Sequence, residues 1–162
     1  MYYYIHLQKY TYRMAENTIL VPILGDCIPI YATEGSSGAD VYALVDPEPY
    51  IEIEPGTCRL ISTGIKVAIP PGFEIQVRSR SGLAFNNQIV VLNSPGTIDS
   101  DYRGEIGVIL MNHGNKAFRV FPGMKIAQLV LAPVSKALFV PRDSLECSPT
   151  KRGTGGFGST GL

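Results

Sequence analysis

The segment Ile65-Lys66-Val67-Ala68-Ile69-Pro70-Pro71-Gly72-Phe73-Glu74-Ile75-Gln76-Val77-Arg78 decides the fold class of this chain. On both sides of the Pro71-Gly72 pair, apolar side chains occupy every second position. A period of two is typical of a half-buried β-strand. Because a Pro-Gly pair favours a tight turn, the segment predicts two strands joined by a turn.

The same pattern recurs along the rest of the chain. Ile51 alternates with Glu52, and a third alternating run covers 106–110. Strands are also predicted at 18–24, 39–44, 57–62, 88–92, 116–121 and 125–131, with further Pro-Gly pairs at 55–56, 95–96 and 122–123 and one short helical turn at 82–87. Many short strands with Gly/Pro turns predict an all-β fold, a jelly-roll-like β-barrel or sandwich.

Three regions are expected in the 162 residues. Residues 1–17 form a loose N-terminal extension, because 1–13 are tyrosine-rich and polar and Met14 is a plausible alternative start. Residues 18–150 form a single β-barrel domain, with no internal repeat or second domain. Residues 151–162 form a flexible glycine-rich arm.

Composition excludes several classes of function. The formal net charge is zero and only 17% of residues are charged. This disfavours a nucleic acid partner, which usually requires a basic excess, and suits a protein that buries surface in an oligomer. Cys27, Cys58 and Cys147 are odd in number and far apart, which indicates thiols in a reducing cytoplasm. No apolar run is long enough to span a membrane.

The segment from Arg152 to Gly161, at the end of the chain, contains five glycines. Glycine lets the backbone approach a ligand closely, and the arginine and hydroxyl groups of this segment are phosphate ligands. Phe157 offers a flat face on which a base could stack. The segment therefore suits an arm that closes over a nucleotide, although its composition also fits a disordered Gly/Ser tail.

Two further segments carry groups suited to chemistry. Residues 93–104 lie between two predicted strands as a hairpin, and its Asp99 could take a proton from water. Arg80 follows a strand and could bind phosphate as a fork, with Ser81 as a hydroxyl donor. The alternatives are a polar turn and a solvated arginine. Gln128 lies in an apolar run and needs a polar partner.

Taken in order, five segments resemble the five motifs of the homotrimeric dUTPase family. They are Ser37-Gly38-Ala39-Asp40, Arg80-Ser81-Gly82-Leu83-Ala84, Gly96-Thr97-Ile98-Asp99-Ser100-Asp101-Tyr102-Arg103-Gly104, Gly123 to Gln128, and the C-terminal tail. The resemblance covers roughly residues 18 to 162. The second, third and fifth motifs are specific, and finding all three in this order by chance is very improbable.

The resemblance implies a cytoplasmic jelly-roll enzyme that hydrolyses dUTP to dUMP and pyrophosphate with Mg²⁺. The reaction keeps uracil out of DNA and supplies dUMP for thymidylate synthesis. The family forms homotrimers with shared active sites, and the tail crosses to a neighbouring chain. The triphosphate brings its own Mg²⁺ partners, so no direct protein ligand of the metal is expected.

The resemblance also implies roles for individual residues. Asp99 activates the attacking water, and Tyr102 packs against the deoxyribose. The backbone from Asn93 to Asp99, with Gly107 opposite, recognises uracil. The remaining substrate-binding positions are Thr97 and Ile98 within that backbone, Arg80, Ser81, Gly82 and Gln128 at the phosphates, with Asp40 in support, and Arg152, Phe157, Gly158, Ser159 and Thr160 in the closing tail.

Two competing functions stay open. A dCTP deaminase of the same fold needs a glutamate in the strand after residue 104, and Ile109 occupies that position. A non-catalytic nucleotide-binding module is the other alternative. Two departures from the family are visible: Met124-Lys125 replace its usual acidic residue and arginine, and Ser79 replaces its usual proline or alanine. His6 and His113 lie in no recognisable catalytic or metal pattern.

Overall fold

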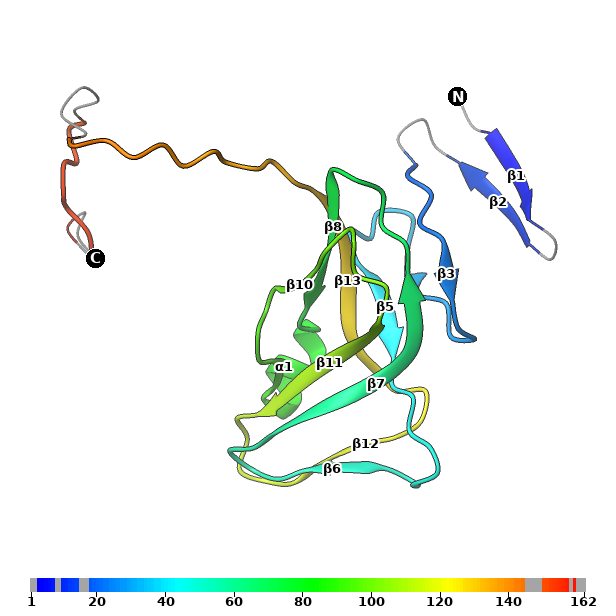
Figure 1. The fold of residues 1–162 in the computed structure, drawn as a ribbon. Coiled ribbons are helices and arrows are strands. Elements are labelled where there is room, and N and C mark those ends of the chain that lie inside the picture. Colours follow the sequence, from blue (N-terminus) through cyan, green and yellow to red (C-terminus); the bar gives the residue numbers. More distant parts are fainter. Residues whose placement is uncertain (1–2, 8–9, 15–17, 145–149, 158, 160–162) are drawn as a thin grey trace.

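Two antiparallel β-sheets pack face to face in the computed structural model, which describes residues 3–7, 10–14, 18–144, 150–157 and 159 (Figure 1). The first sheet has the order β10 (Gly96–Ile98), β8 (Phe73–Arg78), β13 (Lys125–Pro133), β5 (Ala39–Tyr42) and β4 (Ile30–Tyr31). The second has the order β3 (Ile23–Leu24), β7 (Cys58–Val67), β11 (Glu105–Asn112) and β9 (Ile89–Val91). The all-β, jelly-roll-like prediction is confirmed.

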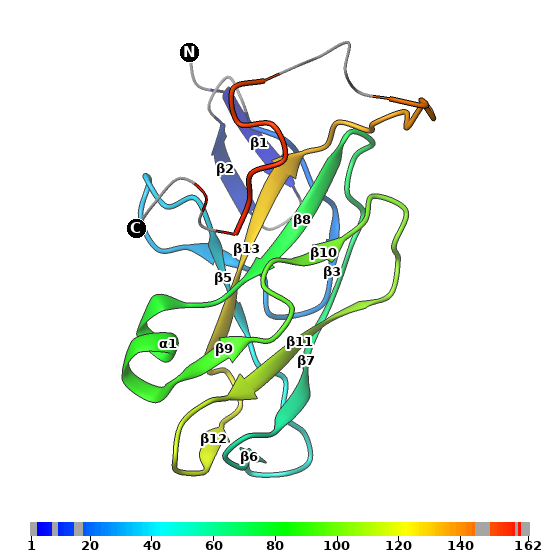
Figure 2. The same cartoon turned by 90° about the vertical axis from the view of Figure 1, so that its left-hand side faces the viewer.

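Smaller elements surround these sheets. β6 (Ile51–Ile53) pairs with β12 (Phe118–Val120) at one end of the molecule, and α1 (Ser81–Asn87) joins β8 to β9 (Figure 2). The α1 helix agrees with the predicted helical turn. No helix among the described residues has the length and apolar character needed to cross a lipid bilayer.

The core lies between the two sheets and follows the predicted period of two. On β11, Ile106, Val108 and Leu110 are buried while the residues between them are more exposed. Ile61 and Ile65 of β7 and Ile126 of β13 complete the centre of the same apolar cluster. Burial of these aliphatic side chains is the main stabilising force of the fold.

Several strand predictions differ from the structure. The predicted strands 57–62 and 65–69 are one strand, β7: Gly64 adopts a positive φ of 69° at an irregularity of the ladder, and the pairing with β11 resumes beyond it at Lys66. The predicted strand 18–24 is reduced to Ile23–Leu24. β4 was not predicted, because two residues are too few to show a periodic pattern.

Three of the four Pro-Gly pairs are turns, with positive φ at Gly56, Gly72 and Gly123. The fourth is not, because Gly96 begins β10. Residues 93–104 are therefore no simple hairpin. The chain leaves β9, pairs with β8 of the other sheet through β10, and returns in β11 beside β9. This crossing between sheets positions the site described below.

The two ends of the chain differ from the body. Within the predicted loose extension, β1 (Tyr3–Leu7) and β2 (Tyr10–Met14) form a hairpin that the sequence analysis did not predict. After β13, residues 134–144 run away from the body as an extended segment (Figure 1). Leu138 and Phe139 in that segment are 88% and 91% exposed.

Candidate active site

A pocket with a volume of about 540 Å³ opens beside β10 and the start of β11. We call it the β10–β11 pocket. Five of its nine lining residues are substrate or catalytic candidates from the sequence: Thr97, Ile98, Asp99, Tyr102 and Gly107. The other four, Leu60, Ser62, Glu105 and Ile109, were not among the substrate or catalytic residues predicted from the sequence. A pocket of this size matches the range of small-molecule sites.

The path of β10 brings the first of these residues to the pocket. Gly96 is buried, and a Cβ on it would lie 3.1 Å from Asn93 Nδ2 and 3.3 Å from Val77 Cβ. A larger residue would push β10 away from β8. Asn93 thus packs behind the strand and is not among the residues that line the pocket.

The Tyr102 ring is held by the backbone that follows it. The Tyr102 hydroxyl donates a 2.9 Å hydrogen bond to the Glu105 carbonyl oxygen. A Cβ on Gly104 would overlap this ring, so glycine permits the close approach. Arg103 Nη1 donates to the carbonyl oxygens of Ser100 (2.7 Å) and Tyr102 (2.8 Å), which closes the loop before β11.

Gly107 and Leu60 form the floor on adjacent strands. A Cβ on Gly107 would lie 2.7 Å from Leu60 Cδ1. Ile109 pairs with Leu60, two positions along the ladder from the Gly107–Ser62 pair. Both strands alternate, so the positions between the core residues must face outward. That pattern was the signal by which Leu60, Ser62 and Ile109 could have been found.

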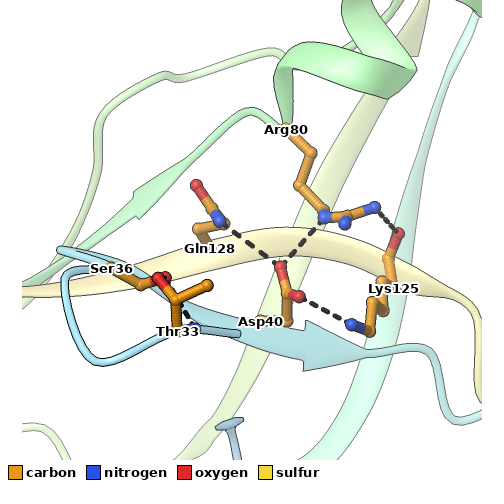
Figure 3. Close-up of polar contacts among 6 residues, drawn as sticks. All are labelled: Thr33, Ser36, Asp40, Arg80, Lys125 and Gln128. Carbon is orange, nitrogen blue, oxygen red and sulfur yellow. Dashed lines mark hydrogen bonds and ion pairs between the residues drawn. The ribbon is translucent and has the colours of Figure 1, made fainter. Parts of the chain in front are cut away.

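A second cluster of predicted residues surrounds the buried carboxylate of Asp40 (Figure 3). Arg80 Nε donates to Asp40 Oδ1 at 3.0 Å, and Gln128 Nε2 donates to the same oxygen at 3.4 Å. Lys125 Nζ forms an ion pair with Asp40 Oδ2 at 2.9 Å. Asp40 is thus the polar partner that Gln128 requires. Lys125, at a position where the chain departs from the family, takes part in the cluster.

Charge and burial oppose one another at Asp40. Burial of the carboxylate by itself raises the pKa of Asp40. The hydrogen bonds from Lys125 and Arg80, together with their positive charges, outweigh burial and hold the pKa below its ordinary value. Asp40 is therefore ionised at neutral pH, and with two cations around one carboxylate the cluster carries a net positive charge.

Arg80 remains able to bind an anion. It contacts Asp40 through Nε and the Lys125 carbonyl oxygen through Nη1 at 3.4 Å, which leaves Nη2 outside these contacts. Ser81 and Gly82 begin α1 directly after it. Ser79 Oγ accepts a 2.8 Å hydrogen bond from the Val91 amide, so the departure at 79 fastens the start of this loop to β9.

The tail residues contact one another in the part of the chain that the structure describes. Arg152 Nε donates to the Gly155 carbonyl oxygen at 2.8 Å, and the Ser159 amide donates to the Gly156 carbonyl oxygen at 3.0 Å. Phe157 is fully exposed, with a φ of 47°. Gly158 and Thr160 lie outside the described residues.

The predicted site residues of one chain therefore fall into three groups: the β10–β11 pocket, the Asp40 cluster and the tail. None of the residues that line the β10–β11 pocket belongs to the Asp40 cluster or to the tail. The pocket can hold a planar ring and a sugar, and the cationic cluster can bind phosphate. The pocket and the cationic cluster are thus built from different residues of the chain.

Comparison with known proteins identifies the family of this chain. The dUTPase family model matches residues 27–161. A protein of Chlamydia trachomatis named deoxyuridine 5'-triphosphate nucleotidohydrolase is 59% identical over 137 residues, covering 85% of this chain and 92% of its own. A Roseobacter denitrificans protein of the same name is 53% identical over 134 residues, with 83% and 86% covered.

Solved structures agree in fold. The dUTPase of Staphylococcus bacteriophage 80alpha, determined with dUpNHpp, superposes with a TM-score of 0.79 at 23% identity. The superposition covers 90% of this chain and all of the phage chain. From the extent of the family match and the identity to these relatives, the chain belongs to the dUTPase family.

Proposed function

We propose that this chain hydrolyses dUTP to dUMP and pyrophosphate. One observation carries the proposal: the β10–β11 pocket gathers Thr97, Ile98, Asp99 and Tyr102 from one short segment and sets Gly107 opposite them. Relatives at 53% and 59% identity that are named for this reaction support the choice of substrate.

The backbone of β10 suits recognition of uracil. β10 is the edge strand of its sheet, and its register with β8 runs from Gly96–Val77 to Ile98–Ile75. An edge strand has one row of backbone amides and carbonyls without a ladder partner. Those groups match the alternating donors and acceptors of a uracil edge. The Tyr102 ring then packs against the deoxyribose.

Asp99 serves as the general base. It lines the pocket and is exposed, so a water molecule has access to its carboxylate. The carboxylate accepts a proton from this water, whose oxygen attacks the α-phosphorus. The bond from that phosphorus to the α–β bridging oxygen breaks, and pyrophosphate leaves. Catalysis of such a displacement is largely positioning and charge neutralisation.

The phosphates bind groups from a neighbouring copy in a homotrimer. Arg80, Ser81, Gly82 and Gln128 lie apart from the pocket of their own chain, so another copy has to supply them. The exposed apolar side chains of residues 134–144 support assembly, because such a segment is stabilised when it packs on another chain. Arg152, Phe157, Gly158, Ser159 and Thr160 close the site as a lid.

Mg²⁺ fits this arrangement as an ion coordinated by the triphosphate of the substrate. It prefers phosphate and water oxygens in near-octahedral geometry, and the cationic Asp40 cluster suits a phosphate chain better than a bare metal ion. When bound, it neutralises charge on the phosphates. We place the reaction in the cytoplasm, where it would keep uracil out of DNA and supply dUMP for thymidylate synthesis.

The test is product analysis with the purified protein and Mg²⁺. Each of dUTP, UTP, dTTP and dCTP is supplied in turn, and pyrophosphate and ammonia are measured. Pyrophosphate from dUTP, with little from the other three, is expected. Ammonia from dCTP would instead identify a deaminase. Tight binding of dUTP without any product would identify a nucleotide-binding module.

A further inference from the structure

Glu105 is a titratable residue of the pocket to which the proposed mechanism gives no role. Its Oε1 accepts hydrogen bonds from the Ser62 hydroxyl, the Gly64 amide (2.9 Å) and the Thr63 amide (3.2 Å). The Ser62 hydrogen bond is the largest of several influences that lower the pKa of Glu105, and the Gly64 amide is the next. This carboxylate is therefore ionised at neutral pH, with one oxygen committed to β7.

These contacts occur where the β7–β11 ladder is irregular. Gly107 pairs with Ser62, but Glu105 pairs with Lys66, so β7 carries extra residues between the two pairs. Backbone amides in such a bulge lose their ladder partners. The Glu105 carboxylate supplies the missing acceptor for Thr63 and Gly64, and thereby fastens the start of β11 to β7.

The backbone of the same residue holds Tyr102. The Tyr102 hydroxyl donates to the Glu105 carbonyl oxygen at 2.9 Å. Glu105 thus connects the β7 bulge, through its side chain, to the Tyr102 ring, through its carbonyl. Any shift of the start of β11 displaces the acceptor of the tyrosine hydroxyl and with it one wall of the pocket.

We propose that Glu105 is a positioning residue that sets the place of the Tyr102 ring and so the selection of deoxyribose over ribose. This rests on the proposed function, in which Tyr102 packs against the sugar. A ring held close to the sugar leaves no room for a 2′-hydroxyl, whereas a ring free to move does. Glu105 therefore acts on specificity through Tyr102 and needs no contact with the substrate.

The experiment compares kcat/KM for dUTP and UTP in Glu105→Ala, Glu105→Gln and Tyr102→Phe. The ratio of kcat/KM for dUTP to kcat/KM for UTP should fall about three- to tenfold in Glu105→Ala, the factor expected for one lost hydrogen bond. The fall should come mainly from a higher KM for dUTP. Glu105→Gln keeps an acceptor oxygen for the two amides and should restore the ratio to within about twofold. Tyr102→Phe should also lower the dUTP/UTP ratio. The double variant Glu105→Ala/Tyr102→Phe should have a ratio no lower than that of Glu105→Ala alone.

Glu52→Ala is the matched control. It removes a carboxylate that bonds Arg119 Nε at 2.7 Å on β6, outside the pocket lining, so it should leave the ratio unchanged. If Glu105→Ala folds and its dUTP/UTP ratio of kcat/KM equals that of the wild type, the proposal is overturned. If Glu105→Ala does not fold, an unchanged ratio in Tyr102→Phe overturns it. A wild-type protein that releases no pyrophosphate from dUTP refutes the proposed function instead, which separates the two failures.

Discussion

Replacing Asp40 by asparagine should lower the free energy of unfolding by about 2 kcal/mol at pH 7. The Asp40 side chain is 3% exposed, and it pairs with Arg80 at 3.0 Å and Lys125 at 2.9 Å. Removing one partner of a fully buried pair costs about 3–5 kcal/mol, and an exposed pair contributes under about 1 kcal/mol. The Arg80 and Lys125 side chains are 29% and 43% exposed, so water can solvate their charges in part when the Asp40 carboxylate is removed. The cost therefore falls between these limits.

The effect should also depend on pH in a defined direction. The folded pKa of Asp40 lies below its ordinary value of 3.8, so its stabilising contribution is complete above that pH. It is lost as the pH falls through the lower folded value. The stability difference between wild type and Asp40→Asn should therefore shrink when denaturation is repeated near pH 3.

Urea denaturation at fixed protein concentration measures both effects, because assembly makes apparent stability depend on concentration. Glu52→Gln is the control: its pair with Arg119, at 2.7 Å, has side chains 33% and 54% exposed, so water screens the pair and its loss should cost much less stability than the loss of the Asp40 carboxylate. Equal costs for the two variants, or a difference for Asp40→Asn that grows at low pH, would refute the reasoning.

Three further predictions concern the pocket, the tail and the assembly. Gly107→Ala places a Cβ 2.7 Å from Leu60 Cδ1, so Leu60 must turn and KM for dUTP should rise about tenfold, which steady-state kinetics would measure. Deleting 151–162 should leave the circular dichroism spectrum and the number of chains in the trimer unchanged but nearly abolish pyrophosphate release, because the lid no longer excludes water. Light scattering should report three chains of 17.6 kDa each, and a fully active monomer would contradict this expectation.

The sequence predicts the alternating strands well because alternation records which side chains face the core. Ile106, Val108 and Leu110 are buried as the pattern requires. The prediction fails at Gly64, where a glycine inside a strand resembles a strand end. It also fails at β10, which pairs with β8 while its neighbours in sequence, β9 and β11, lie in the other sheet. Pairing between distant segments leaves no local pattern in the chain.

The candidate site shows the same limit. The motif around Asp99 identifies four of the nine pocket residues, because these four lie close together in the sequence. Glu105 and Ser62 were missed, although Glu105 directly follows that motif, because their bond spans 43 positions. The role of Lys125 likewise depends on its approach to Asp40, from a different strand.

The activity of Asp99→Asn tests the central claim most directly. Asparagine preserves the shape of the side chain and removes its basicity, so pyrophosphate release from dUTP should fall about a hundredfold or more while nucleotide binding survives. Asp101→Asn is the matched control, because Asp101 is exposed two residues away and does not line the pocket. Near-normal turnover in Asp99→Asn, or an equal loss in both variants, would contradict the assignment of Asp99 as the base.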